Sequence, residues 1–155
     1  MLTHDELNKV YEWGMTTELP YRNAPTAVGY SDREIGYCWL KGQRNFKGVR
    51  ESVVDDPDVV EILNRDEVLF AVGALFYPGT RLFKHRDPDV YICPYRRIHV
   101  PLIVDSEKCY MVWEGKKTNC WESGKFSTWD VMDHIHEAYN DSSEPMEFIF
   151  IDIKK

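Results

Sequence analysis

Two residues near the middle of the chain have the types and spacing of metal ligands. His85 and Asp87 are separated by one residue. In an extended chain, residues i and i+2 point to the same side, so an imidazole nitrogen and a carboxylate oxygen could reach one point. A second imidazole from a distant segment would complete the two-histidine, one-carboxylate triad that binds Fe(II) and leaves coordination positions open. The pair alone is weak evidence, because His-x-Asp is also common on surface turns.

Two further segments carry groups that could act beside such a metal. His134 and His136 follow about 50 residues later. Both imidazoles could face one side of a strand, but the simpler interpretation is one ligand and one neighbouring polar residue. Arg97 and His99, between the two segments, share one face of another predicted strand. Directed inward, they could bind a carboxylate beside the metal. The alternative for Arg97 is a salt bridge with a surface acid.

The segments around these residues have the pattern of β-strands separated by turns. From residue 67 onward, apolar or alternating runs recur at roughly 8–12 residue intervals, which is typical of an all-β sandwich or barrel. Aromatic residues in this region are candidates for a cavity wall, although core packing is the simpler interpretation of each taken alone. These aromatic residues are Tyr91, Tyr95, Tyr110, Trp113 and Trp129. We expect strands at Val68–Tyr77, Arg81–His85, Arg97–Val104, Cys109–Trp113, Phe126–Asp130, His134–Tyr139 and Met146–Ile153.

The N-terminal part of the chain has helix signals instead. Thr3 and Glu6 have the spacing of a capping box, which predicts a helix over residues 3–13. Asp56 can cap a second helix over residues 57–64, because a proline follows it in the first turn, where proline is favourable.

The layout that follows is a helical layer against a β-barrel. Residues 18–50 are punctuated by proline and glycine, which predicts loops with one short strand near residues 37–40. The length fits one domain over residues 1–155, with the helical layer at 1–66 and the barrel at 67–153.

Composition and charge exclude several classes of protein. The net charge of −7 and the pI near 5.2 argue against a nucleic-acid binder, which needs clustered Lys and Arg. No stretch approaches the roughly 18 apolar residues of a membrane span. The first residues lack the pattern of a signal peptide, which predicts a cytoplasmic protein with reduced thiols. The four cysteines form no CxxC pair and are Cys38, Cys93, Cys109 and Cys120.

Four segments, taken together in their order and spacing, resemble one known family. The sequence resembles the aspartyl/asparaginyl β-hydroxylases, which include free-proline cis-hydroxylases, over roughly residues 75–153. The resemblance implies a mainly β, double-stranded β-helix (a cupin-like jelly roll) with the N-terminal helices packed on one face. It also implies a dioxygenase that depends on Fe(II) and 2-oxoglutarate. The segments are PGTRLFKHRD, RRIHVPLIV, GKFSTWDVMDHIHEAYNDSS and FIFIDI.

The resemblance assigns roles to individual residues of this chain. His85 is implied as the first iron ligand and Asp87 as the carboxylate ligand. His136 is implied as the distal histidine, because HEAYNDS begins there with the register of the family pattern and His134 falls two residues too early. Arg97 and His99 match the pair that contacts the iron-bound end of 2-oxoglutarate.

One position departs from the family pattern. The family usually places an arginine ten residues after the distal histidine, to bind the far carboxylate of 2-oxoglutarate. This chain has Met146 there, followed by Glu147. Without a cation the carboxylate would lose a charge-assisted pair. Arg81 is a candidate substitute, because residues 81, 83 and 85 would share one face of a regular strand.

These observations lead to one preferred function and two alternatives. We expect a hydroxylase of an amino-acid side chain, aspartyl/asparaginyl or prolyl, in a peptide or a free amino acid. The alternatives are a metal-binding cupin with a non-oxygenase activity and a barrel that binds without catalysis. Neither a nucleic acid nor a membrane is an expected partner.

Overall fold

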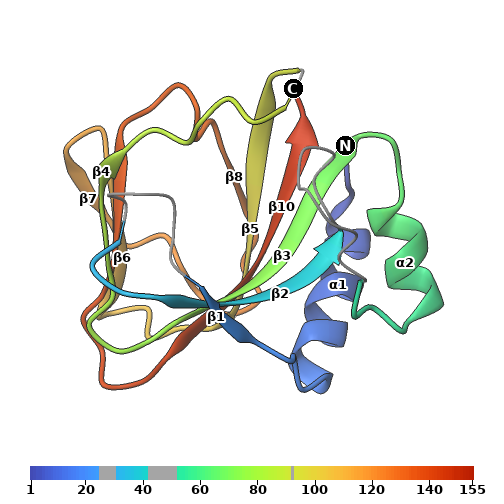
Figure 1. Cartoon of the computed structure of the whole chain (residues 1–155), viewed down its shortest axis with the longest axis horizontal. Coiled ribbons are helices and arrows are strands. Elements are labelled where there is room, and N and C mark those ends of the chain that lie inside the picture. The colour runs from blue at the N-terminus through green and yellow to red at the C-terminus, as the bar shows by residue number, and fades with distance from the viewer. Residues whose placement is uncertain (25–30, 42–51, 92) are drawn as a thin grey trace.

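Two antiparallel sheets face each other, and two helices cover the outer side of the larger sheet (Figure 1). The structure is a computed structural model that describes residues 1–24, 31–41, 52–91 and 93–155. The helices are α1 (His4–Thr16) and α2 (Pro57–Leu63). The larger sheet has the order β1 (Arg22–Ala24), β2 (Ile35–Lys41), β3 (Val68–Phe76), β10 (Met146–Lys154), β5 (Tyr95–Ile103) and β8 (Ser127–Trp129). The smaller sheet has the order β4 (Arg81–His85), β9 (His136–Asn140), β6 (Cys109–Trp113) and β7 (Lys116–Thr118).

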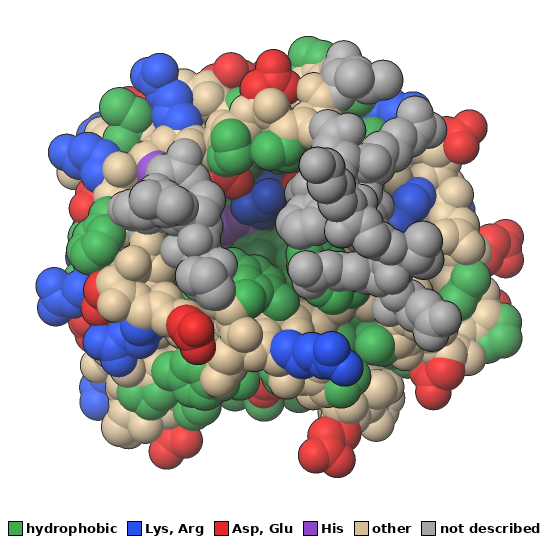
Figure 2. All heavy atoms as spheres, viewed as in Figure 1, with side chains coloured by type: hydrophobic (Ala, Val, Ile, Leu, Met, Phe, Trp, Pro, Cys, Tyr) green, Lys and Arg blue, Asp and Glu red, His purple; other side chains and the backbone are tan. Residues whose placement is uncertain are grey.

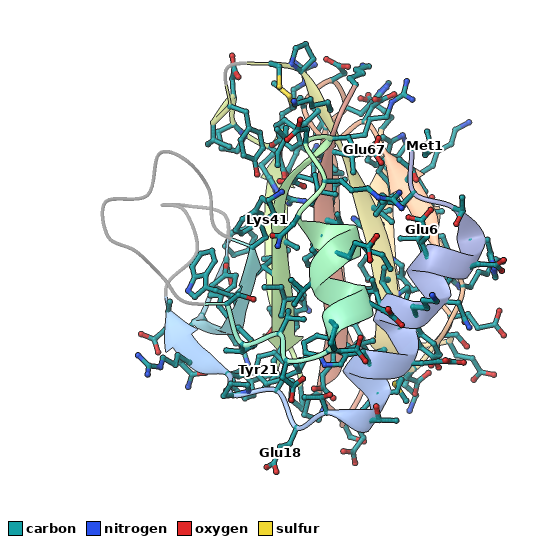
Figure 3. The ribbon with its side chains drawn as sticks, turned by 90° about the vertical axis from the view of Figure 1, so that its right-hand side faces the viewer. Met1, Glu6, Glu18, Tyr21, Lys41 and Glu67 are labelled. Atoms are coloured by element: carbon teal, nitrogen blue, oxygen red, sulfur yellow. The ribbon has the colours of Figure 1, made fainter. Side chains whose placement is uncertain are left out.

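Both helices begin at the caps that the sequence predicts. The Thr3 hydroxyl accepts a hydrogen bond from the Glu6 backbone N–H (3.2 Å) and donates one to the Glu6 carboxylate (3.1 Å). The Asp56 carboxylate accepts from the first backbone N–H groups of α2, at residues 58 and 59. Each cap satisfies donors that a helix start leaves without intrahelical partners. Figure 3 shows α1 and α2 side by side across the sheet, with Met1 near Glu67.

The strands of the larger sheet separate two apolar layers. In β10, Ile149, Ile151 and Ile153 belong to the cluster that packs under the helices. The alternate residues Met146 and Phe148 belong to the cluster between the two sheets. This division follows from the two-residue period of a strand, whose successive side chains point to opposite faces. The inner face therefore receives every second residue of β10.

A bulge in β4 decides which of its side chains face inward. Leu82 pairs with Ala138 and His85 pairs with His136, so three steps along β4 match two steps along β9. The extra residue reverses the alternation of the side chains. Leu82 and His85 therefore share the inner side, and Phe83 is 43% exposed. The expectation that residues 81, 83 and 85 share a face is wrong, because it assumed a regular strand.

The N-terminal third contains more strand than expected. The sequence predicted one short strand within residues 18–50, whereas the structure has β1 and a seven-residue β2. Residues 25–30 and 42–51 of that stretch lie outside the described residues. The short strand β7 was also not predicted. Both missed strands have three residues, too few to show a periodic pattern.

The remaining sequence expectations concern cysteines and membranes. All four cysteines are free thiols, and Cys38 and Cys109 are buried. Among the described residues, no helix combines the length and the apolar character that crossing a membrane requires.

Candidate metal centre

Three side chains expected as ligands meet at one end of the smaller sheet. His85 ends β4, Asp87 follows in the next loop, and His136 begins β9. The antiparallel pairing of β4 with β9 sets His85 directly opposite His136. One ligand atom from each of the three residues lies within 4.8 Å of the others. His134 is not part of the group, because its Nδ1 lies 3.1 Å from the exposed carboxylate of Glu114.

Backbone carbonyls set the tautomers of the two histidines. His85 Nδ1 lies 2.5 Å from the carbonyl oxygen of Phe83, and His136 Nδ1 lies 2.9 Å from that of His134. A carbonyl oxygen only accepts, so each Nδ1 carries a hydrogen and each neutral ring has its lone pair on Nε2. These Nε2 atoms lie 3.3 and 3.1 Å from Oδ1 of Asp87. Two lone pairs and a carboxylate oxygen thus converge, which fits the donor set of a divalent transition metal.

The third candidate ligand, Asp87, is held from two sides. Its backbone N–H donates to the carbonyl oxygen of Val131 (2.9 Å). Its Oδ2 accepts from Nη1 of Arg97 (2.5 Å), while Oδ1 faces the histidines. Burial alone would raise the pKa of Asp87, but the positive charge of the Arg97 guanidinium holds it well below its usual range. Asp87 is therefore a carboxylate at any ordinary pH.

Arg97 faces the interior as expected, and it pairs with a second acid that the sequence analysis missed. Its Nε and Nη2 donate to the two carboxylate oxygens of Asp152, at 2.7 and 3.0 Å. Burial would lower the pKa of Arg97, but Asp152 and Asp87 outweigh burial and raise it. The alternative interpretation foresaw an acidic partner at the surface, whereas Asp152 is fully buried. A lone charge in the apolar segment FIFIDI was the signal that could have revealed it.

His99 lies on the same face of β5 as Arg97 and is a neutral side chain. Its Nδ1 accepts from the indole N–H of Trp121 (3.2 Å), so its own hydrogen is on Nε2. Burial above all lowers the pKa of His99 to about 3, and the positive charge of Arg97 adds to this. The ring packs 4.9 Å from that of Phe150. His99 can therefore serve as an uncharged hydrogen-bond donor.

One of the five candidate aromatics contacts a candidate ligand, and a second packs against the first. Trp113 stacks on His136 with ring centroids 5.5 Å apart, and Trp129 packs 4.8 Å from Trp113. Tyr110 lies outside this group, against Lys117 and Tyr139. Figure 2 shows a hollow between the sheets with a hydrophobic floor, where histidine, basic and acidic side chains gather at one edge. The wall next to the ligands is thus largely aromatic.

The two remaining tyrosines brace the loop that carries Asp87. The Tyr91 hydroxyl donates to Asp152 (2.6 Å), and the Tyr95 hydroxyl donates to the carbonyl oxygen of Pro88 (3.1 Å). Their rings contact each other edge to face, with centroids 4.7 Å apart. Both therefore act as supports of the loop.

Neither position considered for the far carboxylate brings a cation into the interior. Met146 is buried in the inner apolar cluster, opposite Phe76 in the neighbouring strand. Arg81 is exposed, and its guanidinium lies 5.7 Å from the centre of the Tyr139 ring. Tyr139 alternates with His136 and Ala138, which face inward, so Arg81 lies on the outer side of the sheet. The structure thus places Arg81, the candidate substitute, away from the interior, and the bulge in β4 is the reason.

Two facing antiparallel sheets with helices on one side place the chain in the cupin-like, double-stranded β-helix class. Comparison with known families then gives a match to the aspartyl/asparaginyl beta-hydroxylases over residues 6–155, and the chain belongs to this family. No curated protein sequence matches it significantly.

Several solved structures share this fold. A 2OG-Fe(II) oxygenase family oxidoreductase from Burkholderia pseudomallei has a TM-score of 0.67 and 10% identity, over 94% of this chain and 78% of that one. A prolyl-4-hydroxylase from Pseudomonas putida has a TM-score of 0.56 and 10% identity, over 99% and 88% of the two chains. A predicted oxalate decarboxylase from Thermotoga maritima has a TM-score of 0.58 and 14% identity, over 89% and 95%. These likenesses show the fold alone.

Proposed function

We propose that this protein is an Fe(II)- and 2-oxoglutarate-dependent dioxygenase that hydroxylates an amino-acid side chain. The observation that carries the proposal is the convergence of His85 Nε2, His136 Nε2 and Asp87 Oδ1 on one point. Three such donors are the ligand set with which non-haem oxygenases bind Fe(II). Membership of the hydroxylase family supports the reaction class.

The residues around the site have separate tasks in this proposal. Bound Fe(II) would supply the activation of O₂ for hydroxylation of a C–H bond. The Nδ1 atoms of His85 and His136 face backbone carbonyls, so Nε2 is the atom of each ring that would bind the metal. His99 is a neutral donor on the interior face and is suited to hydrogen-bond the carboxylate of a 2-oxo acid. Trp113, which stacks on His136, and Trp129, which packs on Trp113, would form one wall of the site.

The residues fit the two proposed cofactors unequally. The donor set fits Fe(II), and His99 and Arg97 lie on the face where the metal-binding end of 2-oxoglutarate would rest. For the far carboxylate, neither Met146 nor Arg81 provides a cation. The proposal for 2-oxoglutarate therefore rests on membership of the hydroxylase family and on the residues suited to its metal-binding end, His99 and Arg97.

Turnover of 2-oxoglutarate to succinate, with Fe(II) and O₂, tests the proposal. His136→Ala should abolish succinate formation, because it removes one of three ligands. His134→Ala is the matched control and should retain activity, because this exposed residue lies two positions away and contacts Glu114 instead. Equal turnover by His136→Ala and the wild-type protein would refute the ligand assignment. Substrate-dependent succinate formation with aspartyl, asparaginyl and prolyl peptides, and with free proline, would then identify the substrate.

A metal-binding cupin without oxygenase activity is the second candidate, and the apolar surroundings of Met146 favour it. This candidate predicts stoichiometric metal binding that His136→Ala removes, with no succinate formed from 2-oxoglutarate. A barrel that binds without catalysis predicts no stoichiometric metal at all.

A further inference from the structure

Asp152 is a charged side chain in the interior whose partners all lead to the candidate metal centre. It lies near the end of β10, directly between Phe70 of β3 and Arg97 of β5, and its exposure is 0%. Among the described residues, its carboxylate accepts three hydrogen bonds, two from Arg97 and one from the Tyr91 hydroxyl. A buried carboxylate is costly unless it is paired, so this arrangement needs all of its donors.

The first connection from Asp152 to the metal centre is Arg97. The Asp152 carboxylate accepts bidentate hydrogen bonds from Nε and Nη2 of the Arg97 guanidinium, which fixes the plane of this rigid group. Nη1 in the same plane then donates to Oδ2 of Asp87. With Oδ2 held, the other oxygen of Asp87 faces the histidine Nε2 atoms at 3.1 and 3.3 Å. Asp152 thereby determines which oxygen of Asp87 is offered to a metal.

The second connection is the chain segment that carries Asp87. This segment joins β4 to β5 and includes Tyr91, whose hydroxyl lies 2.6 Å from Oδ2 of Asp152. The backbone of Asp87 is fixed to Val131 at the opposite end of the segment. Asp152 is therefore connected to Asp87 in two ways. Arg97 links it to the Asp87 side chain, and the hydrogen bond from Tyr91 links it to the chain segment that carries Asp87.

The charges of the group also favour a divalent cation. The two carboxylates of Asp87 and Asp152 and the guanidinium of Arg97 together carry a net charge of −1. Because Asp152 takes two of the three hydrogen bonds that Arg97 donates within the group, Asp87 is only partly neutralised. Without Asp152, Arg97 would pair with Asp87 alone and compete with the metal for it.

We propose that Asp152 is the positioning residue of the metal centre and acts on Asp87 through Arg97 and Tyr91. On this view, the first task of Arg97 is to orient a ligand, and contact with a cosubstrate is secondary. The inference rests on the proposed function, since it takes His85, Asp87 and His136 as the ligands.

Binding of Co(II) to the metal-free protein, followed by its visible absorption, tests the inference without turnover. Asp152→Asn keeps the shape of the side chain but places an amide against the donors of Arg97. Affinity for Co(II) should fall about 10- to 100-fold, which is the usual effect of losing a partner that orients a ligand. The absorption spectrum of the bound ion should change, because Asp87 is no longer held in one orientation. Loss of folding alone would not alter the spectrum of the molecules that still bind.

Arg97→Lys is the second variant and keeps the positive charge beside Asp152. The lysine ammonium cannot replace the planar guanidinium that hydrogen-bonds both Asp87 and Asp152. The same loss of Co(II) affinity and the same spectral change are therefore expected. The effects should not add in the double variant, because both act on one connection. The pair Arg96–Asp130 supplies matched controls on the neighbouring, partly exposed site. Arg96→Lys and Asp130→Asn should bind Co(II) as the wild-type protein does.

The outcomes separate this inference from the proposed function. If wild-type protein fails to bind Co(II) or Fe(II), the proposed function fails. If wild-type protein binds, and folded Asp152→Asn or Arg97→Lys binds within about twofold and with an unchanged spectrum, only the positioning role is overturned. Should Asp152→Asn not fold, Arg97→Lys alone decides by the same criterion.

Discussion

His85 and His136 face each other across the β4–β9 pair with ring centroids 4.5 Å apart, and a bulge brings them there. The bulge supplies one residue more on β4 than on β9 between the Leu82–Ala138 pair and the histidine pair. Without it, alternation would turn His85 to the outer side, where Arg81 lies.

Deletion of both Phe83 and Lys84 should therefore abolish metal binding. His85 then follows Leu82 directly and turns to the outer side, so Co(II) affinity should fall by more than about 100-fold, beyond the loss from an orienting partner. Titration with Co(II) measures the affinity. Deletion of Lys84 alone is the control, because it leaves one residue of β4 against one of β9 and keeps His85 opposite His136, so binding should be retained. Undiminished binding by the folded double-deletion variant would show that the alternation of β4 does not position His85.

Met146→Arg tests whether the apolar position is the far end of the cosubstrate site. A charge in this buried place should lower the free energy of unfolding by about 3 kcal/mol or more. A charge-assisted pair with the far carboxylate should strengthen 2-oxoglutarate binding about tenfold or more. Calorimetric titration measures the affinity, and Met146→Leu, which keeps the site apolar, is the control. A folded arginine variant with unchanged affinity would place the far carboxylate elsewhere.

His99 should make the metal-free protein less stable in mild acid. Its pKa is lowered to about 3 in the folded chain, against about 6.5 in an unfolded one. Below pH 6.5 the unfolded chain takes up a proton that the folded chain does not, so stability falls as the pH falls. At pH 5.5 the loss should be about 1 kcal/mol. Urea unfolding of wild type and His99→Gln from pH 7.5 to 5.5 measures it. Parallel profiles for the two proteins would contradict the assignment.

Asn140 should matter for folding more than for the metal. Its side-chain amide donates to carbonyl oxygens of Phe76 (3.0 Å) and Glu144 (2.9 Å) and accepts from Ser142 (2.6 Å). Asn140→Ala leaves these buried groups without partners and should cost about 3 kcal/mol or more. Denaturant unfolding measures the loss. Co(II) affinity of the folded fraction should match wild type, and a large drop there would assign Asn140 to the metal centre instead.

The sequence alone was enough to predict most strands, both helix starts and the three candidate ligand residues that the fold brings together. These depend on local chemistry. His85, Asp87 and His136 belong to recognisable motifs, Thr3 and Asp56 are local caps, and the apolar runs of β3 and β10 are long enough to show as strands. Strands as short as β1 and β7 left no such pattern.

Only the tertiary structure decided the face of Arg81 and the partner of Arg97. The face of a side chain in β4 depends on a register with β9, and one extra residue reverses it. The partner of Arg97 is 55 residues away, on a strand that becomes its neighbour only when the sheet forms. A residue's type and spacing are properties of the chain, whereas alternation across a bulge and contact between distant strands exist only after folding.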